Sequence, residues 1–312
     1  MKLTLKSVAF FFMVILLLIV FLSRRDIAVD TLKKTYAQPP SSFISIDDMD
    51  IHYRDEGPVS DSLPLVLMHG TGASLHTFDD WTNALKQQKR VVRMDLPAFG
   101  LTGPFPNRTY TIEHYVAFLD TFLTAKGIKK CILAGNSLGG QIAWAYTAFH
   151  PNKVDKLILI DAAGYPYKSK SKPIAFTLAN IPIANTLLTY ITPRFMIKKS
   201  IENVYADPKK ITPALIDRYF DLTLREGNRQ AFVDRMQTNT IISVNLLKNI
   251  QQPTLILWGE QDDLIPIESA YRFQKDIPHS SLVILKQLGH VPMEEGPNQS
   301  LKPLLSFLKL KL

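Results

Sequence analysis

The feature that most constrains the fold of this chain is a five-residue turn, Gly135-Asn136-Ser137-Leu138-Gly139. The apolar run 130–134 before it reads as a β-strand, and residues 141–146 after it read as a helix. A strand that passes directly into a helix turns very tightly. Only small residues fit two positions before and two positions after the central residue, which explains the two glycines. The turn therefore predicts that the serine hydroxyl lies above the edge of a sheet, within reach of a base.

A serine nucleophile needs a histidine base and an acid that orients this base, and suitable residues follow later in the chain. The apolar strand 253–258 leads into a loop with Asp262, and the strand 281–285 leads into a loop with His290. Because parallel strands end at the same edge of a sheet, both side chains are expected near the serine. We predict that Ser137 attacks, that His290 transfers the proton, and that Asp262 fixes the imidazole tautomer and stabilises the imidazolium.

Two other aspartates compete for the role of the acid. Asp263 adjoins Asp262, and Asp161 directly follows the apolar strand 157–160, from which a carboxylate could also reach the site. The spacing G-x-x-D-x-x-x-P over residues 259–266 favours Asp262. Asp263 is then expected to face solvent or to cap the next helix, and Asp161 to accept hydrogen bonds from loop amides.

Acyl transfer also needs two backbone N–H groups where negative charge develops on the substrate carbonyl oxygen. Leu138, the residue after the serine, is expected to supply one of them. The other is expected from Thr71, in the loop His-Gly-Thr-Gly that follows an earlier apolar strand. His69 and Gly70 are interpreted as residues that shape this loop. Since His69 precedes the nucleophile in the chain, we expect it to order the loop and not to transfer protons.

These motifs resemble those of the α/β-hydrolase superfamily, and together they cover almost all of residues 42–312 in the expected order. The resemblance implies an α/β-hydrolase fold with a mostly parallel eight-stranded sheet, flanking helices and a helical cap. The matching segments are the His69-Gly70 loop, residues 95–102, the serine turn, the Asp262 loop and residues 289–292.

Within the superfamily, the chain resembles bacterial membrane-associated lipases and esterases with a cap, and the serine turn also resembles that of meta-cleavage C–C bond hydrolases. One residue departs from the pattern. Ala98 stands where the family usually has glycine, so it is strained if the site needs a positive φ.

The N-terminus carries fifteen consecutive apolar residues, 8–22, with lysine and arginine on both sides. A spanning helix typically needs about 17–25 residues, but flanking serines extend the segment to residues 7–23 and basic side chains can reach the interfaces. We interpret it as a single-pass transmembrane anchor, with a bacterial inner membrane as the expected location. The alternative is a secreted or periplasmic protein from which residues 1–23 are cleaved, although no small-x-small cleavage site follows. The basic residues favour a cytoplasmic catalytic domain, and a signal-anchor with an exterior domain is the alternative.

The alternation of strands and helices divides the chain into an anchored enzyme with an insertion. The predicted parts are an N-terminal anchor and linker at 1–35, the first part of the hydrolase core at 36–163, a helical cap at 164–245 and the second part of the core at 246–312. Residues 24–41 read as a polar linker. The apolar cap stretches 174–179 and 187–191 predict either packing onto the core or an acyl-chain tunnel or membrane-facing lid. Arg225 and Arg229 are expected on the solvated surface, with contact to an acidic substrate group as the alternative.

Composition excludes several other classes of protein. The formal charge is +8, of which the first 35 residues contribute +4, and no basic stripe with interleaved aromatics points to nucleic acid. The single Cys131 excludes an intrachain disulfide framework. The seven histidines have no metal-ligand spacing, and no complete dinucleotide or phosphate loop is present, so neither a metal nor a cofactor is predicted.

The predicted function is a membrane-anchored serine hydrolase that cleaves carboxylic esters through an acyl-enzyme intermediate. A small-molecule or lipid ester and the membrane are its expected partners, with no obligate protein partner. A C–C bond hydrolase of the same fold is one alternative. A non-catalytic membrane-tethered binding module is another, although such a module has no need for a complete set of catalytic residues.

Overall fold

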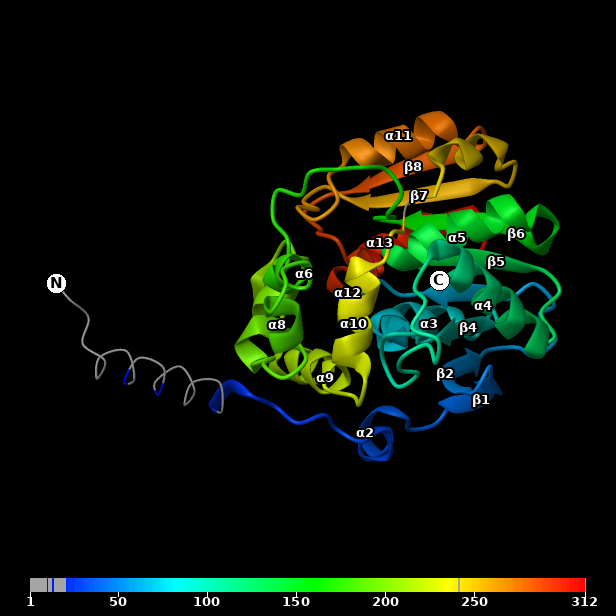
Figure 1. Cartoon of the computed structure of the whole chain (residues 1–312). Helices are drawn as coiled ribbons and strands as arrows, with labels where there is room; N and C mark the ends of the chain where they lie inside the picture. Colours follow the sequence, from blue (N-terminus) through cyan, green and yellow to red (C-terminus); the bar gives the residue numbers. More distant parts are fainter. Residues whose placement is uncertain (1–9, 11–12, 14–20, 241, 312) are drawn as a thin grey trace.

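Eight strands form one sheet in the order β1-β2-β4-β3-β5-β6-β7-β8 (Figure 1). The computed structural model describes residues 10, 13, 21–240 and 242–311. The hairpin β1–β2 is antiparallel and joins β4 antiparallel, whereas all pairs from β4 to β8 are parallel. The strands are β1 Ser42–Ile46, β2 Met49–Glu56, β3 Leu65–Met68, β4 Val91–Met94, β5 Cys131–Asn136, β6 Val154–Ile160, β7 Thr254–Gly259 and β8 Ser280–Leu285.

Helices cover both faces of the sheet, which is why its central strands are mostly apolar. Successive side chains of β3 alternate between two cores: Val66 packs in one core and Leu67 in the other. The first core contains α4 Ile112–Ala125, α5 Leu138–Phe149 and α11 Glu268–Asp276; the second contains η1 Leu75–Phe78, α3 Asp79–Leu85, α12 Pro292–Glu295 and α13 Pro297–Leu308. A short turn, η2 Pro151–Lys153, leads into β6.

Five helices between β6 and β7 form the cap, beside the carboxyl ends of the strands at the left of Figure 1. They lie within the interval 164–245 that the sequence predicts. Proline starts two of the three longer ones: Pro193 precedes α8, and Pro213 opens α9, where the Thr212 hydroxyl accepts a hydrogen bond from the Leu215 amide at 3.1 Å. The elements are α6 Ile174–Leu178, α7 Ala184–Leu188, α8 Arg194–Glu202, η3 Pro208–Lys210, α9 Pro213–Thr223 and α10 Asn228–Gln237, followed by η4 Val244–Asn249.

Residues 24–41 differ from the linker that their polarity suggests. They include the helix α2 Val29–Tyr36, whose Leu32 is buried against Leu101 and Leu222. The backbone of Ile27 pairs with the end of the cap helix α9: its N–H donates to Leu224 at 2.7 Å. The segment is therefore packed onto the cap, because the side chain of Leu32 and the backbone N–H of Ile27 both contact cap residues.

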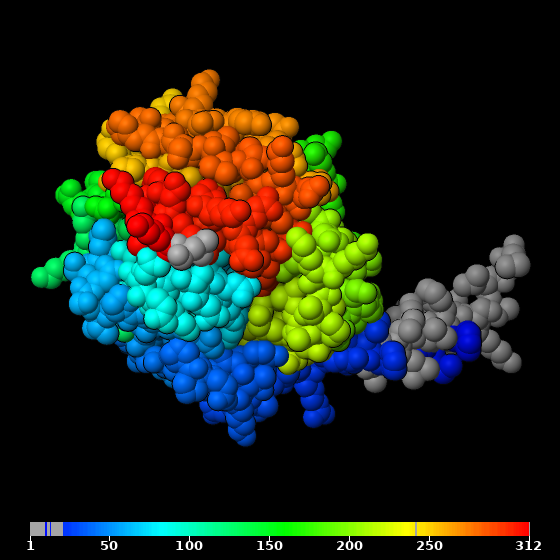
Figure 2. All heavy atoms as spheres, turned by 180° about the vertical axis from the view of Figure 1, so that it is seen from behind, coloured from blue at the N-terminus to red at the C-terminus, as the bar shows by residue number. Residues whose placement is uncertain are grey.

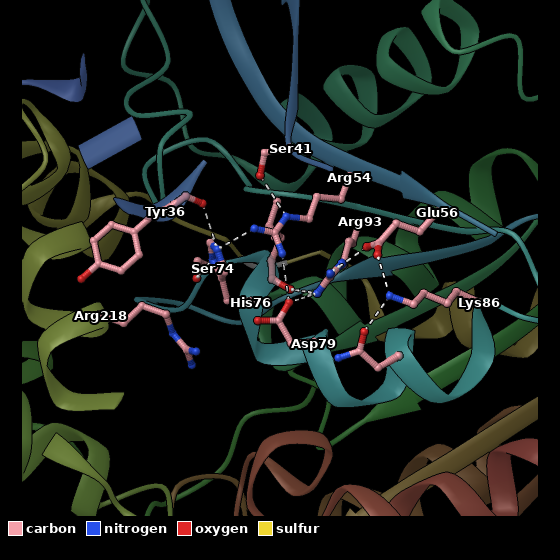
Figure 3. Close-up of polar contacts among 12 residues, drawn as sticks. Tyr36, Ser41, Arg54, Glu56, Ser74, His76, Asp79, Lys86, Arg93 and Arg218 are labelled. Atoms are coloured by element: carbon pink, nitrogen blue, oxygen red, sulfur yellow. Dashed lines mark hydrogen bonds and ion pairs between the residues drawn. The ribbon is translucent and has the colours of Figure 1, made fainter. Parts of the chain in front are cut away.

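The same N-terminal segment is also held by the core, at the base of α2 (Figure 3). The Tyr36 carbonyl lies 3.1 Å from Nε2 of the buried His76. The Ser41 hydroxyl lies 2.8 Å from Nε2 of His52 and accepts a hydrogen bond from Nε of Arg54 at 2.9 Å. The segment therefore bridges the cap and the core.

The transmembrane anchor predicted at residues 7–23 lies for the most part outside the described residues. Among those that are described, no helix has the length and apolar character needed to cross a bilayer.

Candidate active site

Ser137 lies on the turn between β5 and α5, with φ 53° and ψ −114°. A positive φ is uncommon for a residue with a side chain and marks a position where the surrounding structure imposes the conformation. The turn is as tight as the sequence predicts. A Cβ on Gly139 would lie 2.3 Å from the Met68 carbonyl oxygen, and one on Gly135 would lie 2.1 Å from the Gly139 carbonyl oxygen. Both positions therefore require glycine.

The structure brings His290 and Asp262 together, as the sequence predicts. Nδ1 of His290 lies 2.7 Å from Oδ2 of Asp262, and both residues are buried. Oδ1 of Asp262 accepts hydrogen bonds from the amides of Leu264 and Ile265, each at 2.9 Å, so the carboxylate has a fixed orientation. Since Nδ1 is used by Asp262, Nε2 is the ring nitrogen left for Ser137, and both residues line one cavity.

Asp161 lies behind this pair and makes no hydrogen bond to the imidazole. Its Oδ1 accepts a hydrogen bond from the Gly259 amide at 2.8 Å, which is the contact with loop amides that we expect. Burial, and next the charge of Asp262, raise the pKa of Asp161 well above its usual value, which favours the uncharged form of this carboxyl. Asp263 is half exposed, with its carboxylate 4.0 Å from the Lys170 ammonium. Of the three aspartates, Asp262 contacts the histidine.

One group of described residues places three ligand-type atoms within 4.8 Å of one another, and it consists of Asp161, Asp262 and His290. Two of these side chains are already hydrogen-bonded to each other. The third, Asp161, accepts a hydrogen bond from the Gly259 amide, so the contacts of this group are those of an acid, a base and a loop-supporting carboxyl.

His69 orders the loop beside the serine. The Leu96 amide donates to its Nε2 at 2.9 Å, so Nδ1 carries the proton and donates to the Gly70 carbonyl at 2.8 Å. Burial lowers the pKa of His69 and favours this neutral form. The Gly70 backbone lies close to the nucleophile, since a Cβ built on it would be 3.0 Å from that of Ser137.

The two amides expected to bind the oxyanion belong to the residue that follows Ser137 and to a residue that lines the same cavity as Ser137. Leu138 is the first residue of α5, and Thr71 follows Gly70 in the ordered loop. Within the described part of the chain, neither N–H donates a hydrogen bond to another residue. Both donors are therefore free to bind a ligand oxygen.

Two buried polar residues that the motifs do not reveal hold the His290 loop. The side-chain amide of Asn136 donates to the His290 carbonyl at 2.9 Å and to the Ile160 carbonyl at 3.1 Å. The carboxylate of Glu295 accepts from the Gly289 amide at 2.7 Å and from the Asp207 amide of the cap at 2.8 Å. Asn136 adjoins the nucleophile in sequence, which is a usable signal, whereas nothing local marks Glu295.

The cavity above Ser137 is enclosed mostly by apolar side chains of the cap and core. Its volume is about 140 Å³, an order of magnitude above the ~10–15 Å³ that one water molecule needs. Among the described residues that line it, His290 and Arg229 are the only ones that are Asp, Glu, His, Lys or Arg. Apolar residues of the wall include Ala98, Phe99, Phe176, Leu188, Met196, Ile197, Ile201, Leu222, Phe232, Leu264 and Val291.

Three side chains near the cavity test expectations from the sequence. Ala98 has φ 85°, so the strain expected where the family uses glycine is present. The expectation of solvated arginines is wrong. Arg229 is 5% exposed and its Nη2 lies 2.6 Å from Asp26, while Nη2 of the partly buried Arg225 donates to the Thr102 carbonyl at 3.3 Å. Each arginine has a partner distant in sequence, but Nη1 of Arg229 and Nε of Arg225 have no hydrogen-bond partner among the described residues.

The family model for the alpha/beta hydrolase fold matches residues 64–192 and 201–297. The chain belongs to the α/β-hydrolase family. The predicted fold class, with its mostly parallel eight-stranded sheet, is thereby confirmed.

Three α/β-hydrolases similar to the chain cover most of its length. It is 27% identical over 260 residues to Lipase 1 of Psychrobacter immobilis, covering 80% of this chain and 77% of the lipase. It is 26% identical over 275 residues to 2-hydroxy-6-oxo-6-(2'-aminophenyl)hexa-2,4-dienoic acid hydrolase of Metapseudomonas resinovorans, covering 85% and 90%. The crystal structure of a membrane phospholipase A, described as a bacterial virulence factor, is 29% identical with a TM-score of 0.74, covering 90% and 89%. The fold and these relatives support hydrolase activity for this chain.

Proposed function

We propose that this α/β-hydrolase is a membrane-anchored serine esterase or lipase that cleaves carboxylic esters with an acyl chain. The observation that carries the proposal is the cavity: Ser137 and His290 share it, and most of its wall is apolar. Such a wall suits an acyl chain, because each CH₂ group that leaves water contributes about 0.8 kcal/mol to binding.

The proposed reaction follows the contacts of the site. Ser137 Oγ attacks the ester carbonyl while Nε2 of His290 takes its proton, and Asp262 stabilises the imidazolium through the 2.7 Å contact. The amides of Thr71 and Leu138 donate to the oxyanion of the tetrahedral intermediate. His290 then protonates the leaving alcohol, which gives the acyl-enzyme. Water repeats the sequence and releases the carboxylic acid.

The alternative within the fold is a C–C bond hydrolase, the activity named for one relative. A dienoate substrate carries a carboxylate that needs a cationic or hydrogen-bonding partner in the cavity. The one arginine in the wall is Arg229, and Asp26 already neutralises it. Nη1 of Arg229 has no hydrogen-bond partner among the described residues, and we prefer the ester because most of the surrounding wall is apolar.

Hydrolysis rates over a series of p-nitrophenyl esters of increasing chain length, with a dienoate ketone included, test the substrate class. We expect kcat/KM to rise with chain length and the dienoate ketone to be inert. Faster cleavage of the ketone than of every ester would reverse the choice. A fluorophosphonate probe tests the non-catalytic alternative, because it labels only an activated serine. Labelling of the wild type but not of Ser137→Ala supports the enzyme, and no labelling of either supports a binding module.

The membrane anchor at residues 7–23 is the second part of the proposal. Its support is the apolar sequence and the overall similarity to a membrane phospholipase A. We expect the full chain to stay in the membrane pellet after alkaline carbonate washing and to enter solution with detergent. Release by carbonate alone would exclude a spanning anchor.

A further inference from the structure

The outer surface of the cap carries six large apolar side chains that are exposed to solvent. Their exposed fractions run from 40% to 77%, whereas a soluble surface usually leaves such residues scattered. They lie on and between α6, α7 and the start of α8, which pack against one another. We name this surface the cap face and define it by Ile174, Ile181, Ile183, Leu187, Tyr190 and Phe195.

The segment that builds the cap face is strongly basic. Residues 162–201 contain six lysines and arginines and no aspartate or glutamate, so they carry +6. The N-terminal 35 residues carry +4, which leaves −2 for the rest of the chain. Asp217, Glu202 and Asp263 pair with Arg194, Lys198, Lys199 and Lys170, so Lys168 and Lys172 are the basic residues of this segment without an ion pair among the described residues. The basic residues of the segment are Lys168, Lys170, Lys172, Arg194, Lys198 and Lys199, all exposed.

The helices α7 and α8 carry side chains that line the cavity and side chains that are exposed on the cap face. In α7, Leu188 lines the cavity while its neighbour Leu187 is exposed. In α8, Met196 lines the cavity while Phe195 is 64% exposed. Apolar residues on the inner side are explained by the cavity, but those on the outer side have no partner in the described part of the chain that would bury them.

The N-terminal segment begins its path along the protein at the cap face. The Arg24 amide donates to the Tyr190 carbonyl at 2.9 Å, and Ser23 forms an isolated β-bridge with Ile191. Figure 1 shows the first described blue residues beside α8 and α9, and Figure 2 shows the same neighbourhood from behind. The apolar sequence 8–22 thus ends one residue before Ser23, the first of the residues that contact the chain at Tyr190 and Ile191.

We propose that the cap face docks onto an anionic phospholipid bilayer, with its apolar side chains at the acyl boundary and its basic side chains among the headgroups. Exposed aromatic and aliphatic residues beside lysines and arginines are the composition that binds such an interface. The inference rests on the proposed membrane location but not on the proposed chemistry. It adds an orientation: the wall of the acyl cavity lies against the lipid.

Depth-dependent fluorescence quenching tests the orientation with the full chain. Cys131 is the only cysteine and is fully buried, so a fluorophore can be attached selectively to an added surface cysteine. The test variant is Ile183→Cys, at a position that is 77% exposed. The control is Val59→Cys, 87% exposed, in the β2–β3 loop at the amino edge of the sheet, opposite the cap. Both proteins are reconstituted in vesicles of phosphatidylglycerol and phosphatidylcholine, with or without brominated acyl chains.

The docked orientation predicts quenching by brominated lipid on the order of threefold or more for the label at position 183 and almost none for that at position 59, since docked side chains reach the acyl boundary. Equal quenching of the two labels would overturn the proposal. A blue-shifted label at position 183 that brominated lipid does not quench would also overturn it, because another protein surface, such as a second copy, would then cover the face. Fluorophosphonate labelling of the same samples reports separately on the proposed chemistry.

A charge reversal tests the lipid headgroup. Lys168→Glu with Lys172→Glu, added to the Ile183→Cys protein, should reduce the quenching in anionic vesicles and leave it unchanged in purely zwitterionic ones. The exposed pair Lys129→Glu with Lys248→Glu, in the segments that precede β5 and β7, is the matched control and should change neither. The same loss from both pairs would mean that net charge, and not this face, attracts the membrane.

Discussion

Protonation of His76 is expected to destabilise the protein in mild acid. His76 is buried at the base of α2, near the Tyr36 carbonyl and the guanidinium of Arg54 (Figure 3). Burial, as the largest cause, lowers the pKa of His76 from 6.5 to about 4. Between these two values the unfolded chain binds a proton that the folded protein does not. Stability is therefore complete above the unfolded value and falls as the pH drops towards the folded one.

The size of the loss follows from the same two values. At about pH 5, the unfolded histidine is protonated and the folded one neutral, and 1.5 pH units at about 1.36 kcal/mol each give a loss of about 2 kcal/mol. Urea denaturation in detergent at about pH 7.5 and about pH 5 measures it for the wild type and for His76→Gln. Burial also lowers the pKa of His69, which reduces the stability of both proteins in acid by the same amount. The wild type should therefore lose about 2 kcal/mol more than the variant. Equal losses would refute the assignment of a neutral, buried His76.

Three further predictions concern activity. Ser137→Ala should lower ester hydrolysis by on the order of 10⁴-fold or more with an unchanged circular-dichroism spectrum, and a folded variant with a tenth of the wild-type rate would contradict its role as nucleophile. Asp262→Asn should lower kcat by about 10⁴-fold, whereas Asp161→Asn should cost less than about tenfold because that carboxyl bonds the Gly259 amide and not the imidazole; the reverse order in kcat measurements would move the acid to the earlier strand. Leu188→Ser should reduce kcat/KM for long-chain esters more than for short ones, and Leu187→Ser, on the outer side of α7, should leave the ratio unchanged.

Local constraints made much of the core predictable. The turn around Ser137 demands glycine at fixed positions, so its sequence identifies its geometry. Asp262 and His290 follow apolar runs that form parallel strands, and parallel strands place the residues that follow them at one edge. Ala98 could be recognised because a positive φ restricts the residue at that position. Each of these features depends on a few consecutive residues.

The features that escaped prediction depend on partners far apart in the sequence. Arg229 reads as a surface residue until Asp26, 203 positions earlier, is placed beside it. Residues 24–41 read as a linker because the residues that bury Leu32 come from a loop and from the cap. Adjacent leucines at 187 and 188 look equivalent, and only the orientation of α7 separates the cavity wall from the outer surface.

The attachment of the N-terminal segment to the cap affects how the cap can open and how product leaves the enzyme. A lid that swings open as one body needs a free edge, but here the far edge of the cap is tied down by Asp26 and Ile27 and, through α2, to the core. We therefore expect α9 and α10 to stay closed during turnover. The chain after α7 is tied in the same way through Tyr190 and Ile191, whereas the five-residue helix α6 has no backbone bond to the N-terminal segment among the described residues. Fatty product would then leave beside α6, and its exit, rather than the chemical step, would set the rate on long-chain substrates.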